Sequence, residues 1–438
     1  MNNLLRTVAL LLFSGLVFGA AESRAQPPAG DSLTIEVAVQ RALEASAAVQ
    51  QQLASVEAAR ARVDVSRSAE YPVIRGDADY ARLSPVPEIA IPSFGVFDLV
   101  PADNWDLHLG AYHTLYDFGR RTTQVQLNES RVQSASHAVD LTRQERAYLT
   151  VRVFNSILFL RHSISVQDQE IAALNQHLDV TKKRVATGSA TQFDVLTTQV
   201  RVATAENQRA GLRNTLAKQE TVFRQLLNLL PDAPVRIKGE FSVEPIPMNR
   251  DSLVALALTQ RPELQLARDA ESSAMVQQRL ARLEDMPSLK LNVEYGFKNG
   301  YPLDLNVLKS NVVAGAALSV PIWDGHRVRY RKLEADANLQ AERSHLRDLQ
   351  LQVTSETDQA IADMNTAEEK LAITAVQVEQ ADAAVRLARA RYEAGTATNL
   401  DLLDAETNLA AAHLLQEQAK YAYAQSRYGL QQAIGAKM

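Results

Sequence analysis

One motif occurs twice in this chain, as RVATGSATQFDVL at residues 184–196 and as RYEAGTATNLDLL at residues 391–403. Each copy places a glycine, Gly188 or Gly395, after a polar helical stretch, where glycine readily adopts the left-handed conformation that ends a helix. Thr-x-x-Asp follows at the next helix start, as a capping box with Asp in place of the usual Glu or Gln. The motif therefore predicts a helical hairpin in each half of the chain.

The repetition extends far beyond this motif. Asp117 and Arg120 meet Asp324 and Arg327 at the same separation of 207 residues. Upstream, Tyr71-Pro72 matches Met286-Pro287 at a separation of 215 residues, so the first half is eight residues longer between about 73 and 117. We therefore expect two repeats of one unit that reads helix, two strands, long helix, turn, helix.

Apolar residues recur every seven positions in the long segment of both halves, which is the period of a coiled-coil seam. The two series are Ile157, Ile164, Ile171, Leu178, Val185 and Met364, Leu371, Val378, Val385, Tyr392. A single buried helix explains one such series, but two matching series favour a long packing face. Residues 120–186 contain no Gly or Pro, which allows one helix of about 100 Å at 1.5 Å per residue.

The predicted organisation follows from these signals. We expect a first repeat at 26–229, a linker at 230–250 and a second repeat at 251–438. The first repeat is expected to contain strands at about 71–83 and 104–117, a long helix at about 119–187, and flanking helices at about 34–70 and 192–229; the second, strands at about 288–299 and 310–323, a long helix at about 326–394, and flanking helices at about 251–284 and 399–434.

The expected strands have one apolar and one polar face. In LKLNVEYGFK at 289–298, every odd position is apolar and every even position is polar or Gly, as in a sheet with one wet face. A surface sheet lying on the helices is one interpretation, but strands of about 10 residues also match tilted membrane-spanning strands. Four strands cannot close a barrel, since the smallest membrane barrels use about eight.

Oligomerisation resolves that shortage of strands. Three copies with four strands and four helical columns each supply twelve of both, so one symmetry operation closes two tubes. A dimer would make a tight barrel without an obvious pore. The expected fold class is therefore mainly α with a transmembrane β-barrel, in which duplicated halves form a trimeric 12-strand β-barrel and a 12-helix α-barrel.

Composition limits the function. The formal net charge is −5 and the chain has no cysteine, so neither nucleic-acid binding, nor disulfides, nor a lipidated cysteine is expected. Residues 1–25 read as a signal peptide cleaved after Ala25, with Arg6 before the apolar stretch 8–17; a short membrane anchor is the alternative. No metal-ligand, nucleophile or phosphate-loop motif is present. We expect no catalytic residue, metal or cofactor, and no enzyme.

The doubled motif, the LTIEVA opening at 33–38 and ALTQRPEL at 257–264 together resemble the TolC family of outer-membrane efflux proteins. The resemblance covers essentially the whole mature chain. It implies a homotrimer in the bacterial outer membrane, with its helical barrel in the periplasm and the 230–250 linker at its equator. It also implies passive export of substrates delivered by an inner-membrane pump, proton-driven or ABC type, through a periplasmic adaptor protein.

The resemblance also implies roles for residues of the hairpins. A periplasmic aperture is expected from Asp401 and Asp404, together with Tyr392, Asp194, Lys183 and Arg184. The hairpin tips that receive the adaptor are expected to include Gly188, Gly395, Arg184, Arg391, Thr191 and Thr398. Ala397 stands where the family prototype has a locking Arg, and Lys183 where it has a Gln. As a hypothesis, Lys183 or Arg184 reaches Asp401 and replaces that lock.

Alternatives remain at the level of sequence. The same duct can serve type I protein secretion instead of small-molecule efflux, and a periplasmic coiled-coil scaffold without a membrane barrel is a further possibility. The apolar, proline-rich segment 85–101 lies between the first two strands and is expected to fold over the outer mouth as a lid.

Overall fold

The computed structural model describes residues 32–241, 249–302 and 304–436, so the expected signal peptide and part of the expected linker lie outside the described residues. The elements in chain order are α1 (Ile35–Ala45), α2 (Ala47–Ser68), β1 (Val73–Arg82), β2 (Glu88–Ile91), β3 (Gly95–Asp98), β4 (Asp103–Tyr116), α3 (Arg120–Ala186), α4 (Gln192–Leu226), α5 (Arg250–Gln260), α6 (Pro262–Arg282), β5 (Ser288–Lys298), β6 (Lys309–Ser319), α7 (Arg327–Glu393) and α8 (Asn399–Ala433).

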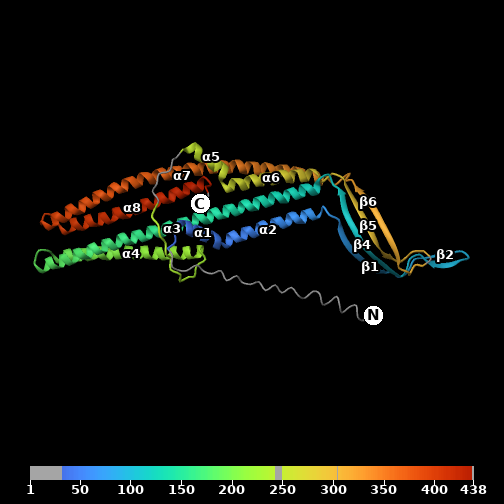
Figure 1. The fold of residues 1–438 in the computed structure, drawn as a ribbon, viewed down its shortest axis with the longest axis horizontal. Helices are drawn as coiled ribbons and strands as arrows, with labels where there is room; N and C mark the ends of the chain where they lie inside the picture. Colours follow the sequence, from blue (N-terminus) through green and yellow to red (C-terminus); the bar gives the residue numbers. More distant parts are fainter. Residues whose placement is uncertain (1–31, 242–248, 303, 437–438) are drawn as a thin grey trace, which may run out of the picture.

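Two helices of 67 residues each, α3 and α7, run the length of the helical part (Figure 1). Between them lie α6 on the sheet side and α8 on the opposite side, placed end to end. In the same way α2 and α4 follow one another along the other flank of α3. The helices therefore form a wall that is one helix thick, with a four-stranded sheet at one end.

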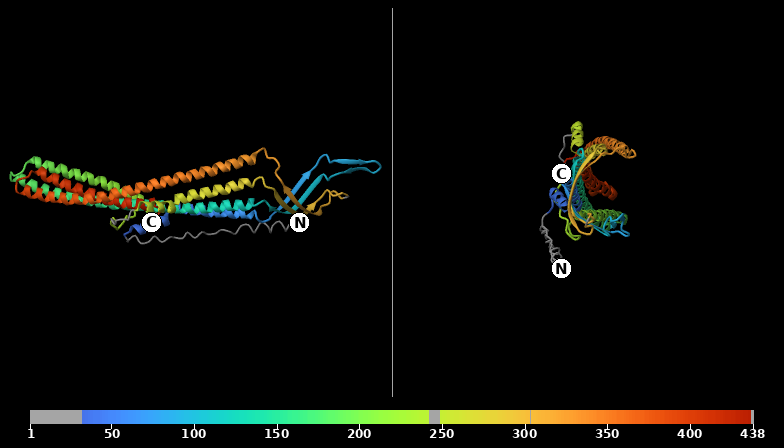
Figure 2. Two further views of the ribbon diagram at one scale, coloured as in Figure 1. Left: turned by 90° about the horizontal axis from the view of Figure 1, so that it is seen from above. Right: turned by 90° about the vertical axis from the view of Figure 1, so that its right-hand side faces the viewer.

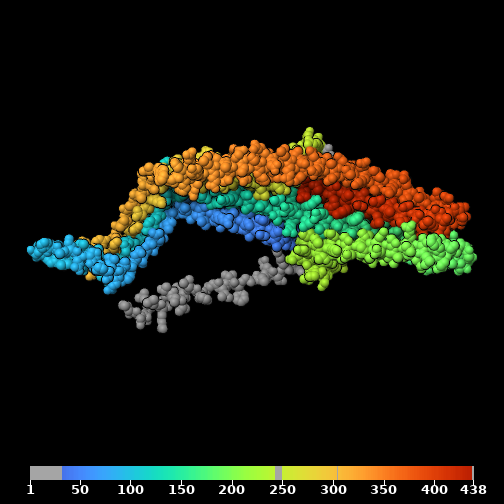
Figure 3. All heavy atoms as spheres, turned by 180° about the vertical axis from the view of Figure 1, so that it is seen from behind, coloured from blue at the N-terminus to red at the C-terminus, as the bar shows by residue number. Residues whose placement is uncertain are grey.

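The wall is curved across its width. Seen end-on, the helices and the sheet follow an arc (Figure 2), and Figure 3 shows the molecule from the concave side. The short helices α1 and α5 lie on the convex side. A curved layer with two free edges is the geometry of a segment of a tube.

The flanking helices differ from the sequence expectation. The single helices expected at 34–70 and 251–284 are wrong, because each is divided in two, at Ser46 and at Arg261. Ser46 has extended backbone angles, and its hydroxyl accepts a hydrogen bond from the Val49 amide at 3.3 Å, which starts α2 anew. Pro262 occupies the first turn of α6, where proline is tolerated but cannot continue a preceding helix.

The seven-residue series lie along the helix interfaces. Ile157 and Met364 are fully buried, and Leu178 and Val385 are nearly so. The largest apolar cluster lies at mid-length, where α1, α3, α4 and the following loop meet; it comprises Leu33, Ala38, Val153, Phe154, Ile157, Leu158, Phe223, Leu227 and Val235. Truncating a fully buried phenylalanine such as Phe154 costs about 3–5 kcal/mol, so this cluster dominates the stability of the middle of the wall.

The sheet has the order β1-β4-β5-β6, with every neighbouring pair antiparallel. The two repeats join in its centre, where Leu109 faces Tyr295 and Ala111 faces Val293. β1 and β6 are its edges. The strand expected to reach residue 323 ends at Ser319.

The sequence pattern missed a second, two-stranded sheet. β2 and β3 pair as a hairpin in the segment that makes the first half longer, with Ile89 opposite Phe97. The hairpin projects beyond the four-stranded sheet, at the end far from the α3–α4 and α7–α8 turns (Figure 1). Within the described ranges, no helix is both long and apolar enough to cross a membrane.

One ion pair ties α8 to α3 near mid-length. The Glu417 carboxylate lies 2.8 Å from His162 Nδ1 and 2.7 Å from Lys420 Nζ. The hydrogen bond to His162 lowers the pKa of Glu417 to about 2, although burial acts in the opposite direction; Lys420 adds to the lowering. A carboxyl whose folded pKa is depressed stabilises the fold above its unfolded pKa of about 4.3, and this contribution is lost as the pH falls towards 2.

We expect Glu417→Gln to reduce the free energy of unfolding by about 1–2 kcal/mol at neutral pH, after allowing for solvent screening. The difference from the wild type should narrow as the pH falls below about 4.5. Denaturant unfolding followed by circular dichroism measures it, with the exposed Glu393→Gln as control. A difference that stays constant down to pH about 2.5 would contradict this assignment.

Candidate functional site

The candidate site lies at the two hairpin tips, α3–α4 and α7–α8, at the end of the molecule far from the sheet (Figure 1). Gly188 and Gly395 have φ of +75° and +74°. Each lets the chain leave its helix at once, because the next amide donates back to a carbonyl of the last turn: Ser189 to Arg184 and Thr396 to Arg391, both at 2.8 Å. The two tips thus share one backbone geometry.

Both returning helices begin with a capping box. Thr398 donates its amide and hydroxyl to Asp401 Oδ2 at 2.8 and 2.7 Å, and the Asp401 amide donates to the Thr398 hydroxyl at 3.2 Å. Thr191 and Asp194 form the same arrangement in the first repeat. The backbone and side-chain hydrogen bonds from Thr398, and then the charge of Arg391, lower the pKa of Asp401. Asp401 therefore carries a fixed negative charge at the tip.

Asp404 is not a free carboxylate. Its Oδ1 accepts from Arg201 Nη2 of α4 at 2.7 Å, and this ion pair connects the two hairpins. The sequence reasoning missed Arg201, although a signal existed. At the repeat separation, Arg201 corresponds to Asn408, and Asp404 corresponds to Thr197. Opposite charges that occur in only one repeat each are candidates for pairing across the hairpins.

A second connection is buried beneath the tip. His177 Nε2 of α3 lies 2.5 Å from Asn399 Oδ1 of α8, and both residues are less than a tenth exposed. The Tyr392 ring lies 5.4 Å from the His177 ring. The sequence analysis did not single out His177, because a lone histidine in a helix carries no signal of its distant partner.

Within one chain, neither Lys183 nor Arg184 reaches Asp401, so the hypothesis that one of them replaces the lock stays a prediction about neighbouring copies. The Arg184 guanidinium instead stacks over the Tyr392 ring, with its carbon 4.3 Å from the ring centroid. Lys183 is exposed, and neither side chain forms an ion pair with Asp401, all three being in the described part of the chain. The structure thus brings Arg184 to Tyr392, and Asp404 to Arg201.

This arrangement can hold two hairpins together through weak polar contacts and can present carboxylates to a passing solute. Within the described ranges, no group of three or more His, Cys, Asp or Glu side chains is placed to hold a metal ion. The curved wall and its paired tips define the class of molecule as a wall segment of a channel.

Comparison with known proteins identifies the family. The family described as Outer membrane efflux protein matches residues 38–229 and 253–436, one match for each repeat. Alkaline protease secretion protein AprF of Pseudomonas aeruginosa is 25% identical over 320 residues, 71% of this chain and 64% of AprF, so the chain spans a little under two thirds of that relative. Protein CyaE of Bordetella pertussis is 24% identical over 408 residues, 91% of this chain and 84% of CyaE.

A solved structure shows the same fold. The outer membrane protein VceC from Vibrio cholerae superposes with a TM-score of 0.79 at 19% identity, covering 92% of this chain and 96% of VceC. The chain belongs to the outer membrane efflux protein family. The resemblance to TolC-type proteins and the expected outer-membrane location are thereby confirmed.

The ion pair between hairpins leads to a prediction. Arg201→Glu and Asp404→Lys should each weaken the closed tip and raise the open fraction of single channels about two- to fivefold, because a half-exposed pair contributes about 0.5–1 kcal/mol. The double charge reversal should return the open fraction towards the wild-type value. Recordings in planar bilayers measure it, and additive effects of the two substitutions would contradict a direct pair.

Proposed function

We propose that this protein is the outer-membrane exit duct of a tripartite efflux pump, which conducts passively what an inner-membrane transporter delivers through a periplasmic adaptor. The observation that carries the proposal is the curved wall with free edges in both its sheet and its helical layer. Within the described part of one copy, the sheet edges β1 and β6 have no strand beside them, and the edge helices α4 and α7 have no helix on their outer side. Heterologous contacts between identical copies close such an arc into a ring.

Exposed apolar side chains support closure along the helical edges. On α4, Phe193, Leu196 and Val200 are each more than half exposed, and on α7 Ile373 and Leu387 are too. These helices lie at opposite edges of the wall on the tip side. In a ring, the α7 face of one copy meets the α4 face of the next, and both are removed from water.

The sheet supports a membrane-spanning barrel in the same ring. Ile74, Leu109, Tyr295 and Val312 are each more than half exposed, and their alternation places apolar side chains on one face. Three copies with four strands each make twelve strands, which encloses a wider lumen than a small eight-strand barrel. The outward face would contact outer-membrane lipid.

Roles at the tips remain part of the proposal. Three copies of Asp401 would surround the aperture with negative charge and favour cations, while Asp404 is partly neutralised by Arg201. The turns around Gly188 and Gly395 are exposed and would receive the adaptor's helical hairpins. The duct itself has no catalytic role, because energy for transport comes from the pump.

Type I protein secretion is a second candidate, because the relative AprF is named as an alkaline protease secretion protein. The duct would be the same and the cargo would be chosen by the pump. An ABC exporter gene beside the gene for a large secreted protein would favour secretion, and a proton-driven pump gene would favour efflux.

Cysteine cross-linking tests the ring, since the chain has no native cysteine. Cysteines introduced together at Ile74 on β1 and Val312 on β6 should give a covalent ladder that ends at a trimer after oxidation. In the control pair, Leu109 on β4 lies directly opposite Tyr295 on β5 of the same chain. Cysteines at these two positions should therefore cross-link only within a monomer. A ladder that ends at a dimer, or no ladder in outer-membrane fractions, would refute the trimer.

The β2–β3 hairpin is proposed as a lid over the outer mouth. Ile89 and Phe97 lie on one face of it, and Phe94 at its turn is about three quarters exposed. An isolated two-stranded hairpin is marginally stable in water, so this apolar face requires cover. Neighbouring copies of the hairpin, brought together over the duct axis, would provide it.

Replacing residues 87–99 by a short Gly-Ser linker should raise single-channel conductance, because the outer mouth would stay open. The matched control replaces Phe94 alone by Ser, which removes apolar surface and leaves the strands β2 and β3 in place. That variant should give an intermediate conductance. An unchanged conductance in the deletion would contradict the lid.

A further inference from the structure

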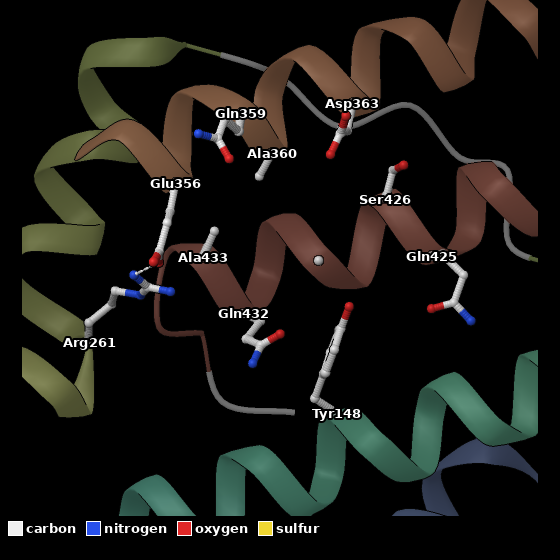
Figure 4. Close-up of a pocket in the computed structure, with 11 residues that line it drawn as sticks. Tyr148, Arg261, Glu356, Gln359, Ala360, Asp363, Gln425, Ser426, Gln432 and Ala433 are labelled. Atoms are coloured by element: carbon white, nitrogen blue, oxygen red, sulfur yellow. Dashed lines mark hydrogen bonds and ion pairs between the residues drawn. The ribbon is translucent and has the colours of Figure 1, made fainter. Parts of the chain in front are cut away.

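A polar recess opens in the helical wall at mid-length, where α6 begins and α8 ends (Figure 4). It has a volume of about 490 Å³, within the range of pockets that hold small organic molecules. Figure 4 shows α7 above α3, as in Figure 1, but with α6 on the left and α8 running to the right. The recess is therefore seen from the concave side of the wall, the side that faces the lumen in the proposed duct.

Several positions that line the recess in α7 and α8 carry apolar side chains in the first repeat. At the repeat separation of 207 residues, its positions Glu356, Ala360, Gly429 and Ala433 correspond to Leu149, Val153, Val222 and Leu226. In the first repeat, Val153 belongs to the mid-length apolar cluster, and Leu149 and Leu226 pack against it. At these positions the second repeat carries a smaller or a charged side chain, and Ala360 and Ala433 leave space that Val153 and Leu226 occupy in the first repeat.

Small residues keep the recess open. A β-carbon added at Gly429 would lie 3.9 Å from the Tyr148 hydroxyl, so any larger side chain at 429 extends into the recess under Tyr148. Ala360 and Ala433 line the recess from α7 and α8 without filling it. The polar remainder of the lining includes the amides of Gln359, Gln425 and Gln432 and the hydroxyl of Ser426.

The charges of the lining are unequal. Arg261 is buried at one end and donates a short hydrogen bond to Glu356. Asp363, two helical turns further along α7, also lines the recess and has no cationic partner in the described part of the chain. The lining therefore holds two carboxylates against one guanidinium, with the uncompensated carboxylate among hydrogen-bonding side chains.

We propose that this recess is a binding site for a hydrophilic organic cation, whose ammonium or guanidinium group meets Asp363 while its polar body bonds to the glutamine, serine and tyrosine side chains. This inference deepens the proposed export function, on which it rests, by naming a class of solute that pauses in the duct wall. A single metal ion is a poorer occupant, because residues seven apart on a helix lie about 10 Å apart along its axis and cannot chelate one ion.

Binding to the full-length purified protein tests the site, with spermidine as the cationic probe and triethylene glycol as a neutral probe of similar length. Isothermal titration calorimetry should detect spermidine binding and no binding of the glycol. The variant Ala360→Val/Ala433→Leu introduces the side chains that the first repeat has at Val153 and Leu226 and thereby fills the recess. It should weaken spermidine binding at least about tenfold. Asp363→Asn should do the same without changing the shape of the recess.

The matched control is Glu369→Gln, which removes one exposed negative charge from α7 outside the recess. It should bind spermidine within about twofold of the wild type, because the recess is unchanged. Any spermidine bound by the carboxylates at the tips should be the same in all of these variants, since none of them alters the tips. The inference would be overturned if Ala360→Val/Ala433→Leu, the filled variant, bound spermidine as tightly as the wild type. It would also be overturned if Glu369→Gln alone lost binding. Because Asp363→Asn alters only an exposed side chain, a failure of the filled variant to fold leaves the test intact.

Channel recordings on the same preparations separate this inference from the proposed function. A wild type that conducts in planar bilayers but does not bind spermidine would overturn the recess and leave the duct standing. A wild type that does not conduct at all would overturn the duct, on which the recess depends.

Discussion

Lateral packing along seams of seven-residue period is the constraint on which this structure depends. Away from mid-length, where α1 and α5 cover it, the wall has no second layer behind it in the described part of the chain, so each helix buries mainly the flanks that touch its neighbours. Ile157 and Met364, at equivalent places in the two repeats, are fully buried in these seams. The seams keep two helices of 67 residues parallel to their shorter neighbours, and every other feature is attached to that frame.

Polar contacts between the hairpins operate on a smaller energy scale. The Arg201–Asp404 pair is half exposed, and such pairs contribute at most about 1 kcal/mol, whereas one large apolar side chain in the mid-length cluster contributes several times more. Glycine turns and capping boxes keep each hairpin intact by itself. The tips can therefore separate from one another while each hairpin and the middle of the wall remain folded, which suits an aperture.

Duplication followed by divergence explains where the polar features lie. The two repeats share the turn, the caps and the seams, but they differ at the positions that carry charge across the hairpins or leave space. Arg201 and Asp404 each occur in only one repeat, and the recess beside Ala360 and Ala433 lies where the first repeat has the larger Val153 and Leu226. Two copies of one scaffold thus supply stability, and the differences between them supply the candidate gate and the candidate binding site.

Sequence alone determined the features that depend on neighbours along the chain. The turns at Gly188 and Gly395, the capping boxes, the uninterrupted helices and the alternating strands all follow from local stereochemistry and period, and the doubled motif identified the family. Tertiary structure alone decided the pairing of Arg201 with Asp404, the stacking of Arg184 on Tyr392 and the partner of His177. Tertiary structure also decided where the helices leave the recess between α7, α8 and α3. These contacts join residues that are about 200 positions apart, and the energy of each is too small to leave a periodic signal in the sequence.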